Sequence, residues 1–362
     1  MTVALGEGKD VQAAGKLEEG MEAGVPYREI EAWLKRGRSR GGSCLPPQQQ
    51  EEGLTRKLET FVKENAEPST SSNYKSEEED DLGPLMELVG SVIDDHDLMS
   101  SALTCLKILS RKQRNRRAIV LTGFKHLASC ADFVRNVPTL AAECANVLLN
   151  FCYERQNVGL FLSCGGVKVL ETYLESEDRG VQANAAGALQ SVSYHEEGRK
   201  ELLASEGLLP RIVNLLASQE PKVRARAVGA LHNLSSEPGT IRIIRNESGI
   251  EQLVELLRDE NGAVAGSAAG ALQNVSREVA SRNIIRESAA VEHLADLLCS
   301  QHVQCQVCAA GALMNILGPE ISSHTHSKPR RAFSKLISQC LTLGIIYNSI
   351  LDPDSTVGRE VV

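Results

Sequence analysis

The pattern of apolar and polar positions repeats along most of the chain. Five segments align without gaps: ECANVLLNF (143–151), NAAGALQSV (184–192), RAVGALHNL (226–234), SAAGALQNV (267–275) and CAAGALMNI (308–316). Within each segment the apolar residues recur at the three- and four-residue spacing of an amphipathic helix. Short polar turns and further apolar runs separate the segments, so each unit predicts a short helix, a middle helix and a long third helix.

Two landmarks fix the length of this unit. The first is the column of Asn150, Ser191, Asn233, Asn274 and Asn315, whose spacings are 41, 42, 41 and 41 residues. We call it the ladder column. The second is the small residue that opens each middle helix: Gly123, Gly166, Gly207, Gly249 and Ala290. Because both landmarks keep the same period, the chain is predicted to be a repeat protein in which each unit must stack on its neighbours to bury its apolar faces.

The third-helix signature A-x-G-A-L-x-N-L resembles that of the armadillo repeat family over residues 83–317. The resemblance implies an all-α, right-handed superhelical solenoid of about five repeats, with the third helices lining a concave groove. HEAT repeats are of similar length but have two helices and no regular asparagine. The first repeat, around LMELVGSVI and SSALTCLKIL, lacks the asparagine and is interpreted as a degenerate terminal unit.

In the armadillo family, the third-helix asparagine points into the groove and bonds the backbone of an extended peptide. The resemblance assigns this role to Asn150, Asn233, Asn274 and Asn315, with Ser191 in the same column. A carboxamide suits the role because it offers both a donor and an acceptor. In the alternative interpretation, which stays open at this point, each asparagine bonds the backbone of the neighbouring repeat.

The residues around the ladder column indicate which partner would fit. Importin-α-like members carry Trp four residues before the asparagine, whereas this chain has Asn146, Gly187, Gly229, Gly270 and Gly311 there, so a nuclear-import receptor is disfavoured. Further candidates for the groove are Arg226, Arg277, Tyr153 and Tyr194. The two arginines would suit an acidic or phosphorylated segment, in the manner of the catenin branch; the alternative is ordinary solvated surface.

Composition and charge narrow the class of protein. The net charge of −8 argues against a nucleic-acid partner. The ten cysteines lie mostly in apolar helical patterns, which indicates a reducing compartment, and no stretch is apolar enough for membrane insertion. We therefore expect a cytoplasmic protein, which a basic run could also direct to the nucleus.

The two ends of the chain differ from the repeats. Residues 1–82 carry a net charge of −6 and contain PPQQQEE, RGRSRGG and PSTSSN, a composition that predicts a disordered acidic segment. Within it, VPYREIEAWLKRG (25–37) groups apolar residues at helical spacing and predicts a short helix. Residues 318–362 restate the start of a repeat, so we expect a linker and an incomplete sixth repeat that exposes an end face for end-to-end self-association.

Two other motifs invite a chemical interpretation. His302, Cys305 and Cys308 have the spacing of zinc ligands, but Cys305 occupies a column filled elsewhere by Val181, Val223 and Val264, which favours a buried thiol and no metal. The basic run RKQRNRR (111–117) could be a nuclear localisation signal, a phosphate-binding patch or a solvated helix junction.

No motif supports catalysis or a cofactor. The sequence thus predicts a non-enzymatic adaptor that binds an extended protein segment. The alternative is a regulator of an enzyme, such as a small GTPase, that contacts a folded partner.

Overall fold

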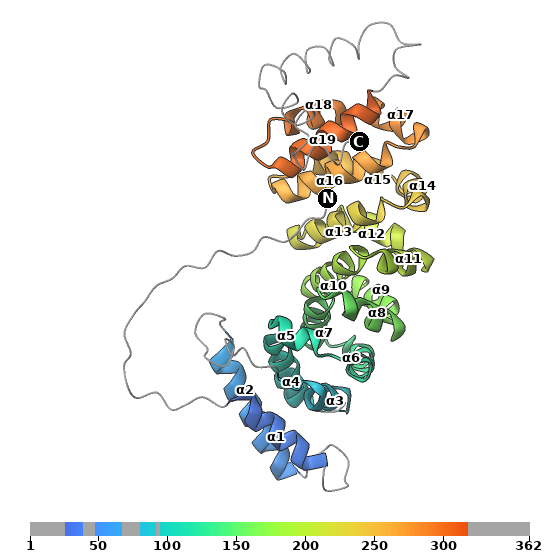
Figure 1. Cartoon of the computed structure of the whole chain (residues 1–362). Helices are drawn as coiled ribbons and strands as arrows, with labels where there is room; N and C mark the ends of the chain where they lie inside the picture. The colour runs from blue at the N-terminus through green and yellow to red at the C-terminus, as the bar shows by residue number, and fades with distance from the viewer. Residues whose placement is uncertain (1–25, 39–47, 67–79, 92–94, 318–362) are drawn as a thin grey trace, which may run out of the picture. The chain divides into compact units, whose positions relative to one another are not determined.

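The computed structural model describes residues 26–38, 48–66, 80–91 and 95–317. Every regular element in these ranges is a helix, and none is a strand. The chain divides into two compact units, residues 1–169 and 170–362, which are treated separately below. The all-α repeat architecture expected from the sequence is confirmed (Figure 1).

The first unit begins with two helices that precede the repeats. Its helices are α1 (Tyr27–Arg38), α2 (Gln48–Asn65), α3 (Gly83–Ser91), α4 (His96–Leu109), α5 (Gln113–Arg117), α6 (Leu121–Val134), α7 (Pro138–Phe151), α8 (Arg155–Ser163) and α9 (Gly166–Leu174), the last of which crosses the division between the units. The long third helices are α4 and α7, which pack against each other, as do the middle helices α3 and α6.

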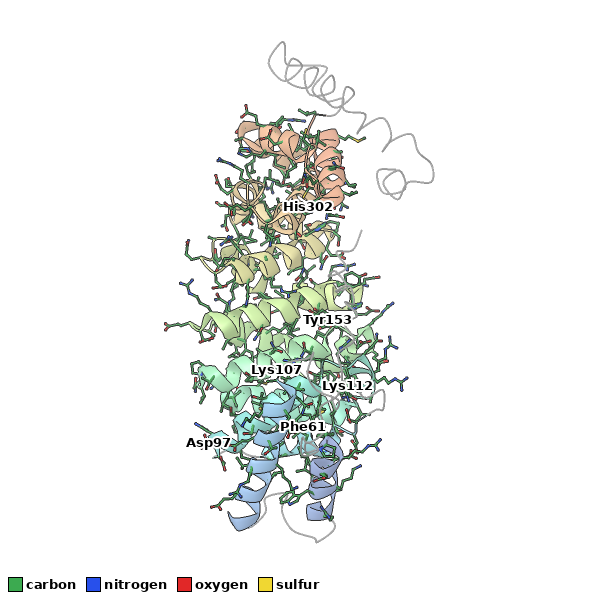
Figure 2. All side chains as sticks on the ribbon, turned by 90° about the vertical axis from the view of Figure 1, so that its left-hand side faces the viewer. Phe61, Asp97, Lys107, Lys112, Tyr153 and His302 are labelled. Atoms are coloured by element: carbon green, nitrogen blue, oxygen red, sulfur yellow. The ribbon has the colours of Figure 1, made fainter. Side chains whose placement is uncertain are left out.

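Helices α1 and α2 belong to the packed core of the first unit. Helix α2 packs on α4 and buries Leu54, Leu58 and Phe61, which follow one another at the four- and three-residue spacing of one helix face. In Figure 2, Phe61 and Lys107 of α4 are labelled close together on the face turned to the viewer. The ring of Tyr27 in α1 packs edge-on against the Phe61 ring, with 6.2 Å between the two ring centroids. These contacts fasten the pair to the first repeat.

This packing differs from the disorder expected for residues 1–82. The short helix expected at 25–37 corresponds to α1, but α2 was not anticipated. Residues 1–25, 39–47 and 67–79 of that segment, and the incomplete repeat expected at 318–362, lie outside the described residues. Two further bonds tie the helix pair to the chain that follows: the Tyr27 hydroxyl donates to the Asp81 carbonyl at 2.9 Å, and the Arg111 guanidinium donates to the Ala66 carbonyl at 3.1 Å.

The second unit contains three complete three-helix repeats and the third helix that precedes them. Its helices are α10 (Arg179–Ser193), α11 (Glu196–Ala204), α12 (Leu208–Leu215), α13 (Pro221–Leu234), α14 (Pro238–Asn246), α15 (Gly249–Leu256), α16 (Gly262–Val275), α17 (Val279–Glu287), α18 (Ala290–Leu297) and α19 (Val303–Ile316). The third helices α10, α13, α16 and α19 each pack on the next and follow one another along the unit in Figure 1.

In the second unit, the polar turns before α10, α13 and α16 supply side-chain caps that start these helices. The Asp178 carboxylate accepts from the Val181 amide at 2.9 Å, and the Asn261 carboxamide accepts from the Ala263 amide at 3.0 Å. Each satisfies one of the free N–H groups at a helix start, which stabilises the helix by about 1 kcal/mol. Helix α13 has Glu220 as its N-cap, whose carboxylate accepts from the Lys222 amide, and also Pro221 in its first turn, where the missing N–H costs nothing.

Candidate functional site

The ladder asparagines of the second unit lie between consecutive third helices. The Nδ2 group of Asn233 donates to the Ser193 hydroxyl at 3.1 Å and to the Gln190 carbonyl at 3.4 Å, both on the preceding third helix. Asn274 and Asn315 repeat this arrangement one and two repeats on, with Ser235 and Ser276 as the hydroxyl acceptors, each at 3.0 Å. The donor half of each carboxamide is therefore used to join adjacent repeats.

The same arrangement occurs in the first unit. Nδ2 of Asn150 donates to the Ser110 hydroxyl at 2.8 Å and to the Lys107 carbonyl at 3.4 Å. In the first repeat the ladder column is occupied by Ile108, which is 1% exposed on α4, the helix that α2 covers. The degenerate first repeat thus offers no polar ladder group.

The serine two residues after the ladder column was not recognised from the sequence. Its column contains Ser110, Cys152, Ser193, Ser235 and Ser276. Each serine is followed by an asparagine in the ladder column of the next repeat, whereas Cys152 is followed by Ser191. The hydroxyl of Ser191 donates to the Gly187 carbonyl of its own helix at 3.2 Å.

Glycines next to the ladder make room for side chains of the preceding repeat. At Gly270, a Cβ atom would collide with the imidazole of His232, and at Gly229 and Gly311 it would collide with the carboxamides of Gln190 and Gln273. Each of these side chains lies one residue before the ladder column of its own repeat. Three of the positions that hold Trp in importin-α-like proteins are therefore filled here from the preceding helix.

The imidazole of His232 is kept neutral by this packing. Burial lowers the pKa of His232 from 6.5 to about 4. Between these values the unfolded chain binds a proton that the folded chain does not, so the free energy of unfolding falls as the pH is lowered through this window and is fully retained above it.

We expect His232→Gln to remove part of this acid sensitivity. Glutamine is the residue at the same column in the neighbouring repeats, as Gln190 and Gln273, and it fits over a glycine there. The variant should match the wild type at pH 7.5 and should lose less stability between pH 6.5 and 4.5. Denaturant unfolding across that range measures the difference, and parallel curves for the two proteins would contradict the prediction.

The third helices of the second unit carry cations, and not all of these have an acidic partner. The four third helices of the second unit contain Arg179, Lys222, Arg224 and Arg226 and no Asp or Glu. Arg224 pairs with Asp259 at 3.2 Å. Arg226 instead donates to the Gln190 carboxamide oxygen at 3.2 Å, and Arg277, which follows α16, donates to the Asn274 carboxamide oxygen. Neither Arg226 nor Arg277 forms an ion pair with a described residue.

The two candidate tyrosines are exposed. Tyr153 is 42% exposed in the first unit, and Tyr194, which packs edge-on against His195, is 46% exposed in the second.

Glu143, the residue of α7 seven positions before Asn150, pairs with Lys107 at 2.6 Å. An acidic group on the third helices of the first unit is thus already neutralised.

The basic run 111–117 has a structural role in the first unit. Lys112 pairs with Asp80 at 2.9 Å, and Arg116 and Arg117 both pair with Glu154, at 3.0 and 3.1 Å. These cations join the start of the first repeat and the turn after α7 to the α4–α5 connection. The run is therefore more than a solvated junction, and most of its charge is already paired.

Of the motif at His302, Cys305 and Cys308, the two cysteines lie in the repeat core and His302 is exposed. Cys305 and Cys308 are buried on α19, and the Cys305 thiol donates to the Gly262 carbonyl at 3.1 Å. Within the described ranges, no three His, Cys, Asp or Glu side chains are grouped in a way that could hold a metal ion. None of the described helices is long and apolar enough to cross a bilayer.

Comparison with known proteins finds an armadillo-type repeat and relatives among the catenins. The model of the armadillo/beta-catenin-like repeat matches residues 196–236. The juxtamembrane domain-associated catenin of Caenorhabditis elegans is 36% identical over 69 residues, which are 19% of this chain and 6% of that protein. Junction plakoglobin of Rattus norvegicus is 27% identical over 237 residues, which are 62% of this chain and 31% of that protein. The aligned region thus spans about a third of the plakoglobin length.

A solved structure shows the same fold. A designed armadillo repeat protein in complex with the peptide (KR)4 matches with a TM-score of 0.58 and 20% identity, over 66% of this chain and all of that one. The helical repeats and their packed third helices therefore define an armadillo-type solenoid. The repeat match and the relatives show that this chain is similar to armadillo repeat proteins, the catenins among them.

Proposed function

We propose that this protein is a non-enzymatic scaffold that binds an extended, acidic segment of a partner protein along the third helices of its second unit. The observation that carries the proposal is the charge of these helices. They hold four cations and no Asp or Glu in a chain whose net charge is −8. Acidic side chains are confined to the other helices and the turns of that unit.

Arg226 and Arg277 are the cations best suited to meet a carboxylate or phosphate. Each is hydrogen-bonded to a neutral carboxamide oxygen, which orients the guanidinium without neutralising it. A guanidinium can bind a carboxylate or a phosphate through two N–H groups at once. The designed armadillo repeat protein is in complex with a basic peptide, (KR)4, and the charge on the present helices favours a ligand of the opposite sign.

Peptide display against the purified protein tests this proposal. We expect linear peptides rich in Asp, Glu or phosphoserine to be selected. Replacing both cations, Arg226→Gln with Arg277→Gln, should weaken binding of a selected peptide about fivefold at low salt, as expected when two charge-assisted contacts at a solvated surface are lost. Arg242→Gln, an exposed cation on the first helix α14, is the matched control and should leave binding unchanged.

Peptide display, together with affinity selection of folded proteins on the same purified protein, separates the two functional classes. Selection of only neutral or basic peptides would contradict the proposed charge preference. Recovery of folded partners whose binding depends on a nucleotide, with no linear peptide selected, would favour the enzyme-regulator alternative. A cytoplasmic location is the expectation that accompanies the scaffold function.

A further inference from the structure

We propose that the asparagine ladder presents only its carboxamide oxygens to a partner, and so recognises N–H groups of the bound segment but not its carbonyl groups. This inference rests on the proposed function and specifies which atoms of the partner are read. It starts from the hydrogen-bond network that holds each ladder asparagine. The network has the same form at Asn150, Asn233, Asn274 and Asn315.

The serine in this network determines which way the carboxamide faces. A hydroxyl has one proton to donate. The Ser235 hydroxyl donates it to the His232 carbonyl at 2.7 Å, three residues earlier on the same helix. Ser193 and Ser276 do the same to the carbonyls of Gln190 and Gln273, at 2.8 and 2.7 Å. With that proton used, the serine oxygen can only accept, and the group that approaches it must be the asparagine NH2.

The backbone carbonyl at the same place imposes the same orientation. Nδ2 of Asn315 also lies 3.1 Å from the Gln273 carbonyl, which can only accept. If the carboxamide were turned over, its oxygen would face two acceptors at once, and their mutual repulsion would cost more than a hydrogen bond. The orientation of the amide therefore follows from its surroundings.

The carboxamide oxygens are left for other partners. The Asn274 oxygen accepts from Arg277, so at this repeat the arginine occupies the acceptor. The oxygens of Asn233 and Asn315 have no donor among the described residues, and neither is among the buried polar atoms that lack a partner. They are thus accessible acceptors on the third-helix face.

A row of acceptors places a specific demand on the partner. An extended segment has N–H and C=O groups in alternation, and only its N–H groups can bond to these oxygens. Proline has no N–H, so a proline facing Asn233 or Asn315 would leave the oxygen unpaired. The ladder would then select against proline and N-methylated residues at two defined positions, without selecting any side chain.

The first part of the test needs no ligand. In NMR spectra of the free protein, the side-chain NH2 protons of Asn233, Asn274 and Asn315 should exchange with solvent at least tenfold more slowly than those of the exposed Asn246. Ser235→Ala should accelerate exchange at Asn274 and leave Asn315 unchanged. Exchange at the ladder as fast as at Asn246 would overturn the inference, whatever the protein binds.

The second part uses a linear peptide obtained by display. Each amide of the peptide is replaced in turn by an ester, which removes the N–H and keeps a carbonyl. We expect two replacements to weaken binding about fivefold in the wild type. One of them should cost less than twofold in Asn233→Ala, and the other less than twofold in Asn315→Ala.

The outcomes separate the inference from the function on which it rests. Binding that is weakened by the asparagine variants but is insensitive to every ester would overturn the acceptor-only ladder while keeping the groove. If no linear peptide is selected and the ladder NH2 protons are nevertheless protected, the proposed function fails but the network stands.

Discussion

Phe61→Ala should lower the free energy of unfolding of the first unit by about 3 to 5 kcal/mol, the usual cost of removing a buried phenyl ring. Phe61 is 1% exposed, and its ring meets that of Tyr27, so the variant leaves a cavity between α1, α2 and the first repeat. Trp33, the single tryptophan of the chain, lies on α1, so its fluorescence reports directly on this part of the molecule.

Denaturant unfolding followed by Trp33 emission measures the effect. Lys63→Ala, an exposed position on the same helix α2, is the control and should shift the midpoint little. If α1 and α2 did not pack on the first repeat, Trp33 would emit as in the unfolded chain and Phe61→Ala would change nothing. That result would show that neither helix is part of the folded unit.

The double variant Asn233→Ala with Asn274→Ala should weaken binding of a display-selected peptide at least tenfold. It removes the open oxygen of Asn233 and the carboxamide that orients Arg277. The contacts between repeats add a second consequence. Each asparagine also donates to a serine and a carbonyl of the preceding repeat, so the variant should lose about 1 kcal/mol of stability per site.

Binding is measured by titration calorimetry on protein shown to be folded by circular dichroism. Asn246→Ala on α14 is exposed and serves as the control for both quantities. Full affinity in the folded double variant would exclude these asparagines from the binding surface. Unchanged stability together with weakened binding would show that the contacts between repeats contribute nothing.

The sequence predicted the repeats because the same kinds of residue recur at the same positions of successive units. Ala and Gly recur where third helices approach closely, and the ladder asparagine recurs in phase with them. Helix α2 was not anticipated because polar, low-complexity sequence flanks a short apolar face. PPQQQEE and PSTSSN at its two ends outweighed Leu54, Leu58 and Phe61 between them, although their four- and three-residue spacing is the signature of one helix face.

The sequence predicted which residues form the candidate site but not which way their carboxamide groups face. The ladder column could be counted from the sequence, but the direction of each carboxamide depends on a serine 39 or 40 residues earlier and on the proton that this serine gives to its own helix. The periodic serine was visible in the sequence as a second column. Only the structure shows that the two columns meet.

The absence of acidic residues from the third helices of the second unit has a consequence for how fast a partner associates. An acidic segment that diffuses toward a protein of net charge −8 is repelled from most of its surface. The acidic helices and turns repel an approaching acidic chain, and the third helices of the second unit attract it. These two effects orient the chain toward the arginines before any short-range contact forms. The association rate should thus depend on ionic strength, whereas the lifetime of the complex should depend on the uncharged ladder. Salt would then change how fast the partner binds, and the sequence of the partner would change how slowly it dissociates.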